Sequence, residues 1–255
     1  MRANPLLVET LRGIAAPGRA QSDYLNYLLI QAIVVVVWWP KDALLDALGR
    51  GQVPDTLRAS VLAAGAAVAY FSVRAGAEEV RLTGQHGIRE WALASPLSLG
   101  RVLAGYLQAQ VVLAAYLTLL ATPPVLMAFA VSGGEWAPLA WCFAAILFQA
   151  TFYRLAGAVV YLAIGHHAAM TFLGVRAILI VTYVASAVLV PLASHVVLSA
   201  RLLRLEVGPP DAGEWLTASL GFLALYAAAS MLLVLVMYRQ LSRDMPPPAV
   251  PVTSP

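Results

Sequence analysis

Long apolar stretches, separated by short polar ones, dominate the pattern along this chain. Six of them stand out, at residues 21–39, 57–73, 99–130, 136–164, 171–198 and 215–238. Because a helix needs roughly 20 apolar residues to cross the hydrocarbon core of a bilayer, each stretch is expected to form one transmembrane helix. The pattern therefore predicts an all-α, polytopic integral membrane protein. Pro123 and Pro124 lie inside the third stretch and should kink that helix or end it early.

The composition agrees with this prediction. Hydrophobic residues make up 61% of the chain and charged residues only 11%, whereas a soluble domain has about 25% charged residues. The formal net charge of +3 is small and its carriers are dispersed, so no nucleic-acid partner is expected. Cys142 is the single cysteine, which excludes an internal disulfide and a cysteine-based metal site.

The positions of arginine and lysine predict how the spans are oriented. Eleven of these residues fall on the side that holds both termini: Arg2, Arg12, Arg19, Arg74, Arg81, Arg89, Arg101, Arg154, Arg176, Arg239 and Arg243. Five fall on the other side: Lys41, Arg50, Arg58, Arg201 and Arg204. Since the side richer in Arg and Lys stays in the cytoplasm, both termini are expected to be cytoplasmic, with the chain in the cell (inner) membrane.

Polar segments divide the chain further. Residues 1–20 are expected to form a cytoplasmic amphipathic segment, 21–244 the six-helix domain, and 245–255 a proline-rich cytoplasmic tail. Within the domain, the loops 40–56 and 199–214 would lie outside, and the long loop 75–98 would lie in the cytoplasm.

The N-terminal segment has the pattern of a short helix lying on the inner membrane face. Asn4 is placed as an N-cap and Pro5 as the first helical residue. The apolar stripe consists of Leu7, Leu11 and Ile14, and the polar residues off that stripe are Glu9 and Arg12. This arrangement is typical of an interfacial amphipathic helix, and a frayed polar tail is the alternative.

The loop 75–98 is the most informative segment outside the spans. It is rich in charge, and Ile88, Trp91, Ala92 and Ser95 follow the i, i+3, i+4, i+7 spacing of one helix face. We therefore expect a short helix with one apolar face. Either Ser95 or Ser98 would then act as the N-cap of the third span.

Two stretches of the chain resemble a known family. The first reads Gly87-Ile88-x-Glu90-x-x-Leu93-x-Ser95-Pro96-Leu97-Ser98, between the second and third of six spans. The second is the opening Asn4-Pro5-Leu6-Leu7-Val8-Glu9-x-Leu11-Arg12. Both are similar to the corresponding segments of ABC-2-type transporter permeases, although Ile88 stands where that family usually has threonine.

The resemblance implies a transport subunit that lacks its own ATPase. Two permease subunits, identical or paralogous, would form the membrane path, and separate ATP-binding subunits would supply ATP and Mg²⁺, so no cofactor is expected in this chain. The helix at 88–94 would be the coupling helix seated in the ATPase. The ATPase-coupling residues would be Gln85, Gly87, Ile88, Arg89, Glu90, Trp91, Leu93, Ser95 and Pro96.

Within that helix, Ile88 and Trp91 are expected to anchor in the partner's groove, while Arg89 and Glu90 set the register. The alternative for Trp91 is that it anchors the loop at the lipid interface, where tryptophan is common.

The residues also indicate that the chain has no energy source of its own. A Walker A loop requires a lysine after a glycine-rich stretch, and the only lysine, Lys41, follows Trp39 and Pro40. All 13 acidic residues lie outside the six stretches or at their edges, which disfavours an ion-coupled carrier. No catalytic set is recognised, so an enzyme is not expected. A non-transporting membrane anchor or assembly subunit is the alternative function, and the substrate stays open.

Several polar residues lie within the apolar stretches and are candidates for the transport path. They are Gln31, Gln108, Gln149, Tyr153, Arg154 and Arg176, with Gln110 beside them. The glutamines and Tyr153 would contact substrate or satisfy one another across helices. Snorkelling to headgroups is the default for both arginines. The alternative is an interhelical pair or a contact to an anionic, lipid-like substrate. The stretch Ala63–Ala67, with Gly65 at its centre, favours close helix packing.

Overall fold

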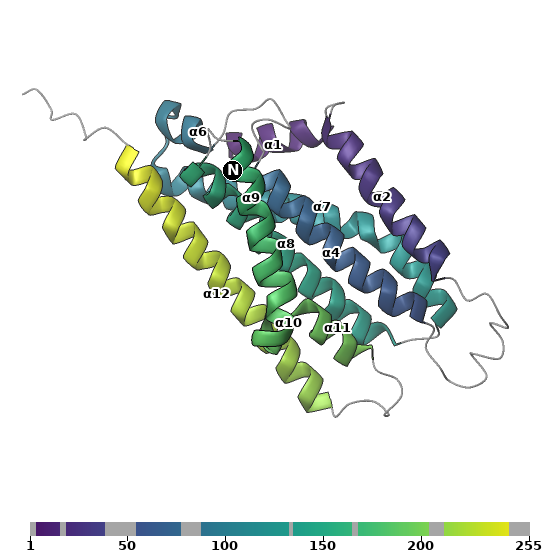
Figure 1. The fold of residues 1–255 in the computed structure, drawn as a ribbon. Coiled ribbons are helices and arrows are strands. Elements are labelled where there is room, and N and C mark those ends of the chain that lie inside the picture. The colour runs from purple at the N-terminus through teal and green to yellow at the C-terminus, as the bar shows by residue number, and fades with distance from the viewer. Residues whose placement is uncertain are drawn as a thin grey trace, which may run out of the picture.

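The computed structural model describes residues 4–15, 19–38, 55–77, 88–132, 135–164, 168–203 and 212–244. Every element within these ranges is helical. The longest are α4 (Asp55–Ala77), α7 (Leu99–Ser132), α8 (Trp136–Ile164) and α12 (Ala212–Asp244), and they form a bundle (Figure 1). Gln85 and Gly87, the loop 40–54 and the tail 245–255 lie outside the described residues.

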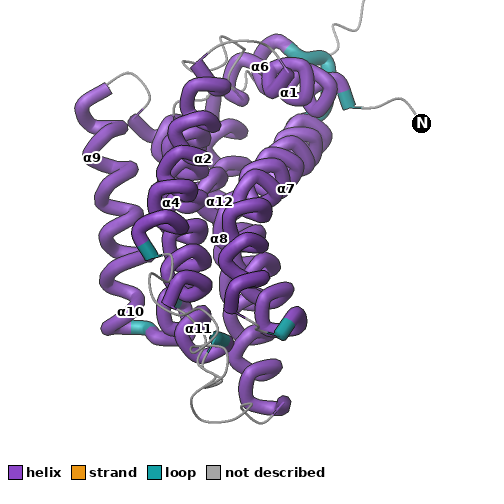
Figure 2. Tube along the Cα trace, turned by 90° about the vertical axis from the view of Figure 1, so that its right-hand side faces the viewer, coloured by secondary structure: helices purple, strands orange, loops and turns teal. Residues whose placement is uncertain are grey.

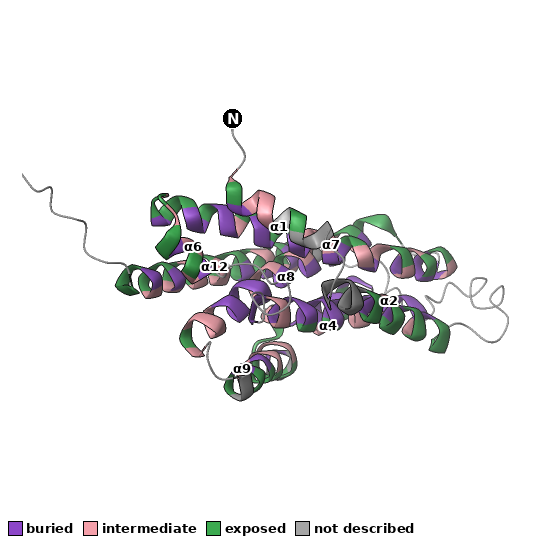
Figure 3. Cartoon of the chain, turned by 90° about the horizontal axis from the view of Figure 1, so that it is seen from above, coloured by how far each residue is buried: buried purple, intermediate pink, exposed green. Residues whose placement is uncertain are grey.

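Shorter helices complete the bundle. They are α1 (Pro5–Ala15), α2 (Arg19–Val37), α6 (Ile88–Ala94), α9 (Ala168–Leu179), α10 (Ser186–Leu189) and α11 (His195–Leu202). Helices α1 and α6 lie at one end of the bundle, which also holds the C-terminal end of α12, and we call it the α6 end (Figures 1 and 2). Helix α9 stands at one side of the bundle (Figures 2 and 3).

Among the described residues, four helices are long and apolar enough to cross a membrane: Thr56–Ala77, Leu99–Ser132, Trp136–Ile164 and Leu216–Asp244. They match the second, third, fourth and sixth predicted spans. The first and fifth predicted spans contain shorter apolar helices, at Leu25–Val37 and Met170–Val184. The chain thus has the helical, apolar character of a membrane protein, and four of the six predicted spans contain a helix long enough to cross a bilayer.

The fifth stretch is not one helix, which corrects the prediction for 171–198. Helix α9 continues through a π-helical segment, η1 (Ile180–Ala185), into α10, and a 3-10 turn, η2 (Pro191–Ala193), then separates α10 from α11. Proline has no backbone N–H and disfavours a helical residue before it, and Val190 has φ −138° and ψ 76°. Ser194 starts α11 anew, because its hydroxyl accepts a 3.4 Å hydrogen bond from the Val197 amide.

The third stretch differs in the opposite way. Helix α7 runs through Pro123 and Pro124 and ends only at Ser132, so of the two predicted effects, a kink or an early end, the early end is wrong. In apolar surroundings a helix remains the simplest way to pair backbone groups, so the chain stays helical although both prolines lack an amide hydrogen.

Helices α4 and α8 form the most extensive helix pair in the described bundle, and glycines make their approach possible. A Cβ on Gly157 would overlap the carbonyl of Val73, and one on Gly76 would overlap the carbonyl of Arg154. In the small-residue stretch of α4, Ala64 and Ala67 are buried. Close packing was predicted for this stretch and is confirmed at Gly65, where an added Cβ would overlap the His195 ring.

Burial is concentrated between the helices, while the outer sides of α2 and α12 are exposed (Figure 3). The exposed side chains there are large and apolar, as with Leu25 on α2 and Leu232 on α12. Lipid chains, unlike water, make such a surface favourable.

Candidate functional site

The α6 end brings together the two segments that the sequence singled out. A buried apolar group, which we call the α6-end cluster, joins α1, α6, α7, α8 and α12. Its members are Leu6, Ile88, Ala92, Leu99, Val102, Leu103, Tyr106, Ala109, Leu155, Ala158, Met237 and Leu241. Because each of the five helices buries side chains here, they are packed as one unit at this end.

Helix α6 turns its apolar face into this cluster. Ile88 is 2% exposed and Ala92 is 3% exposed, and Trp91 packs against the cluster while partly buried. Glu90 and Leu93 are exposed on the other side, Leu93 by 51%. The predicted short helix with one apolar face is confirmed. Its apolar face, however, is covered by this chain, so Ile88 is an internal residue here and not one displayed to a partner.

A serine-proline turn connects α6 to α7. The Ser95 hydroxyl accepts a 3.2 Å hydrogen bond from the Leu97 amide, while the Ser95 amide donates to the Trp91 carbonyl at 3.0 Å. Ser98 immediately precedes α7, and its carbonyl accepts from the amides of Arg101 and Val102. Of the two predicted cap positions, Ser98 is the one at the start of the third span.

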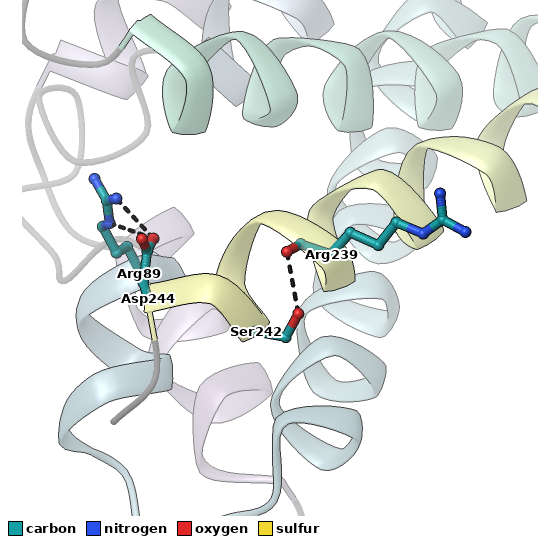
Figure 4. A network of polar contacts seen from close by, with 4 residues as sticks. All are labelled: Arg89, Arg239, Ser242 and Asp244. Atoms are coloured by element: carbon teal, nitrogen blue, oxygen red, sulfur yellow. Dashed lines mark hydrogen bonds and ion pairs between the residues drawn. The ribbon is translucent and has the colours of Figure 1, made fainter. Parts of the chain in front are cut away.

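An ion pair fixes α6 to the end of α12. The Arg89 guanidinium donates to Oδ2 of Asp244 from Nη2 at 2.6 Å and from Nε at 3.1 Å (Figure 4). Both side chains remain about a third or more exposed, at 40% and 34%. An exposed pair of this kind contributes only about 0–1 kcal/mol to stability, so it links α6 to α12 with little effect on the stability of the bundle. Asp244 was missed in the sequence, because 155 positions separate it from Arg89.

Helix α1 is attached to α7 through its N-cap. The Asn4 Oδ1 accepts from the Leu6 amide at 3.1 Å, and its Nδ2 donates to the Arg101 carbonyl at 3.2 Å. A Cβ on Gly105 would overlap the Asn4 side chain, so the absence of a side chain at Gly105 lets Asn4 pack against α7. The predicted cap at Asn4 followed by Pro5 is confirmed.

Other side chains of α1 follow the amphipathic pattern in part. Leu6 is buried in the α6-end cluster and Leu7 packs against it, whereas Arg12 is exposed and Glu9 partly buried. The side chain of Leu11 lies outside the described residues. The face that α1 turns inward therefore includes Leu6, which the predicted stripe omitted.

The candidate path residues on α8 are paired inside the bundle. Arg154 is 4% exposed, and its Nε donates to Gln110 Oε1 at 2.6 Å. The interhelical alternative is therefore confirmed for Arg154, and the snorkelling prediction is wrong. Arg176 is exposed and lies over the Phe172 ring at 3.1 Å from the centroid.

A second polar group links α8 to the interrupted fifth stretch and α12. Gln149 Nε2 donates to the Tyr226 hydroxyl at 3.4 Å, which donates to the Ala193 carbonyl at 2.9 Å. The Tyr153 and Thr182 hydroxyls lie 2.7 Å apart. These polar groups hydrogen-bond to one another across helices, which was one of the two predicted roles; contact with substrate was the other. Gln108 is exposed, and Gln31 is fully buried.

His195 is a buried packing residue with a hydrogen bond, as expected for a histidine within an apolar stretch. Its Nε2 lies 3.3 Å from the Ser199 hydroxyl, and its ring occupies the space that a Cβ on Gly65 would need. Within the described ranges, no three His, Cys, Asp or Glu side chains come close enough to hold a metal ion. His166 and His167 lie outside these ranges.

Comparison with known proteins finds no matching family model, no similar curated protein and no similar solved structure. The functional argument therefore depends on the chain's own residues. They define a helical protein of membrane character, with two short helices attached to one end of its bundle.

Proposed function

We propose that this chain is the permease subunit of an ATP-driven ABC-2-type exporter, forming the membrane path as a dimer and coupled to a separate ATP-binding subunit. The observation that carries the proposal is α6, a short helix between two membrane-length helices that is fixed to the bundle end and exposes Glu90 and Leu93. The sequence around it, from Gly87 to Ser98, is the stretch that resembles the family's coupling segment.

In this proposal the partner ATPase contacts the outer side of α6. Leu93 supplies the apolar contact and Glu90 the charged one, in the manner of a helix in a groove. Ile88 and Trp91 act from the inner side, where they connect α6 to the α6-end cluster. A displacement of α6 by the partner is then passed to α7, α8 and α12, because the cluster is too densely packed to absorb it.

The membrane topology in this proposal has six spans with both termini in the cytoplasm. Helix α2 has 19 residues, which at 1.5 Å per residue is about 28 Å, close to the roughly 30 Å of the hydrocarbon core. The continuous segment formed by α9, η1 and α10 has a comparable length. The eleven-to-five distribution of Arg and Lys supports a cytoplasmic α6 end.

Purification of the tagged chain from its native membrane in mild detergent, followed by mass spectrometry, tests the proposal. We expect a soluble P-loop protein at close to one copy per permease. Partners that include no nucleotide-binding protein would instead favour the anchor or assembly subunit, and α6 would then dock a partner of another kind.

A further inference from the structure

Helix α2 turns polar side chains inward and apolar ones outward. Tyr27 and Gln31 lie one turn apart on its inner face, and both are 0% exposed. On the outer face Leu25 is 64% exposed and Leu29 is 59% exposed. In a helix surrounded by lipid, inward polar groups are expected to pair with other polar groups of the bundle.

Tyr27 and Gln31 do not pair in this way. The Tyr27 hydroxyl and both polar atoms of the Gln31 amide are buried without a hydrogen-bond partner among the described residues. The other buried glutamines contrast with this, since Gln110 accepts from Arg154 and Gln149 donates to Tyr226. A buried polar group without a partner destabilises the folded state, and natural structures contain few of them.

The residues of α4 that pack against the inner face of α2 offer no hydrogen bond to Tyr27 or Gln31. Tyr27 packs edge-on against Phe71, with centroids 5.7 Å apart, and the Thr56 hydroxyl donates to the Trp38 carbonyl. Helices α2 and α4 are therefore antiparallel, and Gln31 falls opposite the Ala63–Ala67 stretch. These side chains carry no polar atoms, and neither the buried Ser60 and Ser72 hydroxyls of α4 nor a side chain of α7, which also packs against α2, hydrogen-bonds the Gln31 amide. The described bundle therefore supplies no partner for Gln31.

The character of that partner follows from the charges nearby. No charged residue occurs between Leu25 and Val37, between Ala59 and Val73, or between Val102 and Ser132. An ion without a counter-charge is strongly disfavoured in such a place. An amide and a phenol can both donate and accept hydrogen bonds, which suits uncharged hydroxyl or amide groups.

We infer that Tyr27 and Gln31 form a contact surface for an uncharged, hydrogen-bonding transport substrate, which reaches them when α2 separates from α4. The inference depends on the proposed function. In this inference α2 is the wall of the transport path that moves when the path opens. The Gln31 amide binds the substrate and does not stabilise the closed bundle.

Thermal unfolding of the purified chain tests whether the Gln31 amide stabilises the closed bundle. Gln31→Leu removes a buried amide that has no partner, so it raises the melting temperature. The matched variant Gln149→Leu breaks the hydrogen bond to Tyr226 and lowers it. A lower melting temperature for Gln31→Leu would mean that Gln31 has a structural partner and would overturn the inference.

Cysteine labelling in membrane vesicles tests whether the surface opens. In a Cys142→Ala background, single variants Gln31→Cys, Gln149→Cys and Ile30→Cys are exposed to an uncharged, water-soluble methanethiosulfonate reagent, with the ATPase partner and with or without ATP. All three label equally after denaturation, which confirms that each chain is present. We expect Gln31→Cys alone to react in the native membrane, several-fold faster with ATP.

The outcomes separate this inference from the proposed function. Labelling at position 31 at equal rates with and without ATP supports the opening surface and counts against ATP coupling. A Gln31→Cys chain that stays unlabelled with and without ATP, while its denatured control reacts, overturns the inference.

Discussion

The glutamines inside the apolar helices have the same side chain and three different surroundings. Gln110 and Gln149 are buried and hydrogen-bonded, Gln108 is exposed two positions from Gln110, and Gln31 is buried without a described partner. Helical spacing indicates which face a glutamine occupies, but the partner on the next helix decides its role. For this reason the sequence could name these residues and leave their roles as alternatives.

At this scale the Arg154 contact yields a direct prediction. Gln110→Leu removes the acceptor of a hydrogen bond from a buried cation, and such bonds are worth about 1.5–3 kcal/mol. We expect the free energy of unfolding to fall by about 2 kcal/mol, measured by thermal or denaturant unfolding in detergent. Gln108→Leu is the control on the same helix and is expected to change it by less than about 0.5 kcal/mol. Equal effects of the two variants would argue against the Arg154 contact.

At the scale of single elements, α1 and α6 are short helices whose positions are set by α7. Asn4 serves both as the cap of α1 and as its attachment to the Arg101 carbonyl, while the turn at Ser95 directs α6 into α7. An isolated helix shorter than about 12 residues is marginal in water, so these contacts and the α6-end cluster are what stabilise both helices.

The packing of Asn4 against Gly105 can be tested with a matched pair of glycines on α7. In Gly105→Ala the new Cβ overlaps the Asn4 side chain, whereas in Gly100→Ala it meets open space. We expect Gly105→Ala to detach α1 and to accelerate hydrogen exchange of the α1 amides several-fold. Gly100→Ala should leave α1 exchange unchanged. Slow exchange of α1 in both variants would show that Asn4 is not its attachment.

The sequence predicted α6 closely and the fifth stretch poorly, for physical reasons. The apolar spacing from Ile88 to Ser95 is a local signal, and so are Asn4 and Pro5, which is why these features were recognised. The helix break at Pro191 was missed because the apolar pattern continues on both sides of it. Pro123 and Pro124 predicted a kink or an early end, and the early end does not occur, because a helix remains the simplest way to pair backbone groups in apolar surroundings.

At the scale of the whole molecule, the α6 end connects segments that are far apart in sequence. The α6-end cluster joins five helices, and the Arg89–Asp244 pair joins α6 to the end of α12. These contacts between distant segments could not be predicted from any local sequence pattern. In the proposed mechanism, they are the route by which a partner at α6 moves the membrane helices.

The ion pair can be tested by exchanging its charges. Arg89→Asp and Asp244→Arg each place like charges together, so each should lower ATPase stimulation in the assembled complex, and the double variant should restore it. Stability should change by less than about 1 kcal/mol in each case, because the pair is exposed. Arg239→Ala, on the same helix but outside the pair (Figure 4), is the control and should behave like the unmodified chain. A double variant no better than the single ones would mean that the pair does not transmit movement.

Photo-crosslinking from the outer side of α6 tests the central claim most directly. A benzophenone amino acid is placed at Leu93, which is 51% exposed, or at Val111, which is 41% exposed in the middle of α7, and the adducts formed in native membranes are identified by mass spectrometry. The account predicts an adduct between position 93 and a P-loop ATPase, with none from position 111. If position 93 forms adducts only with proteins that bind no nucleotide, or with lipid, α6 is not a coupling helix and the chain is not the permease proposed here.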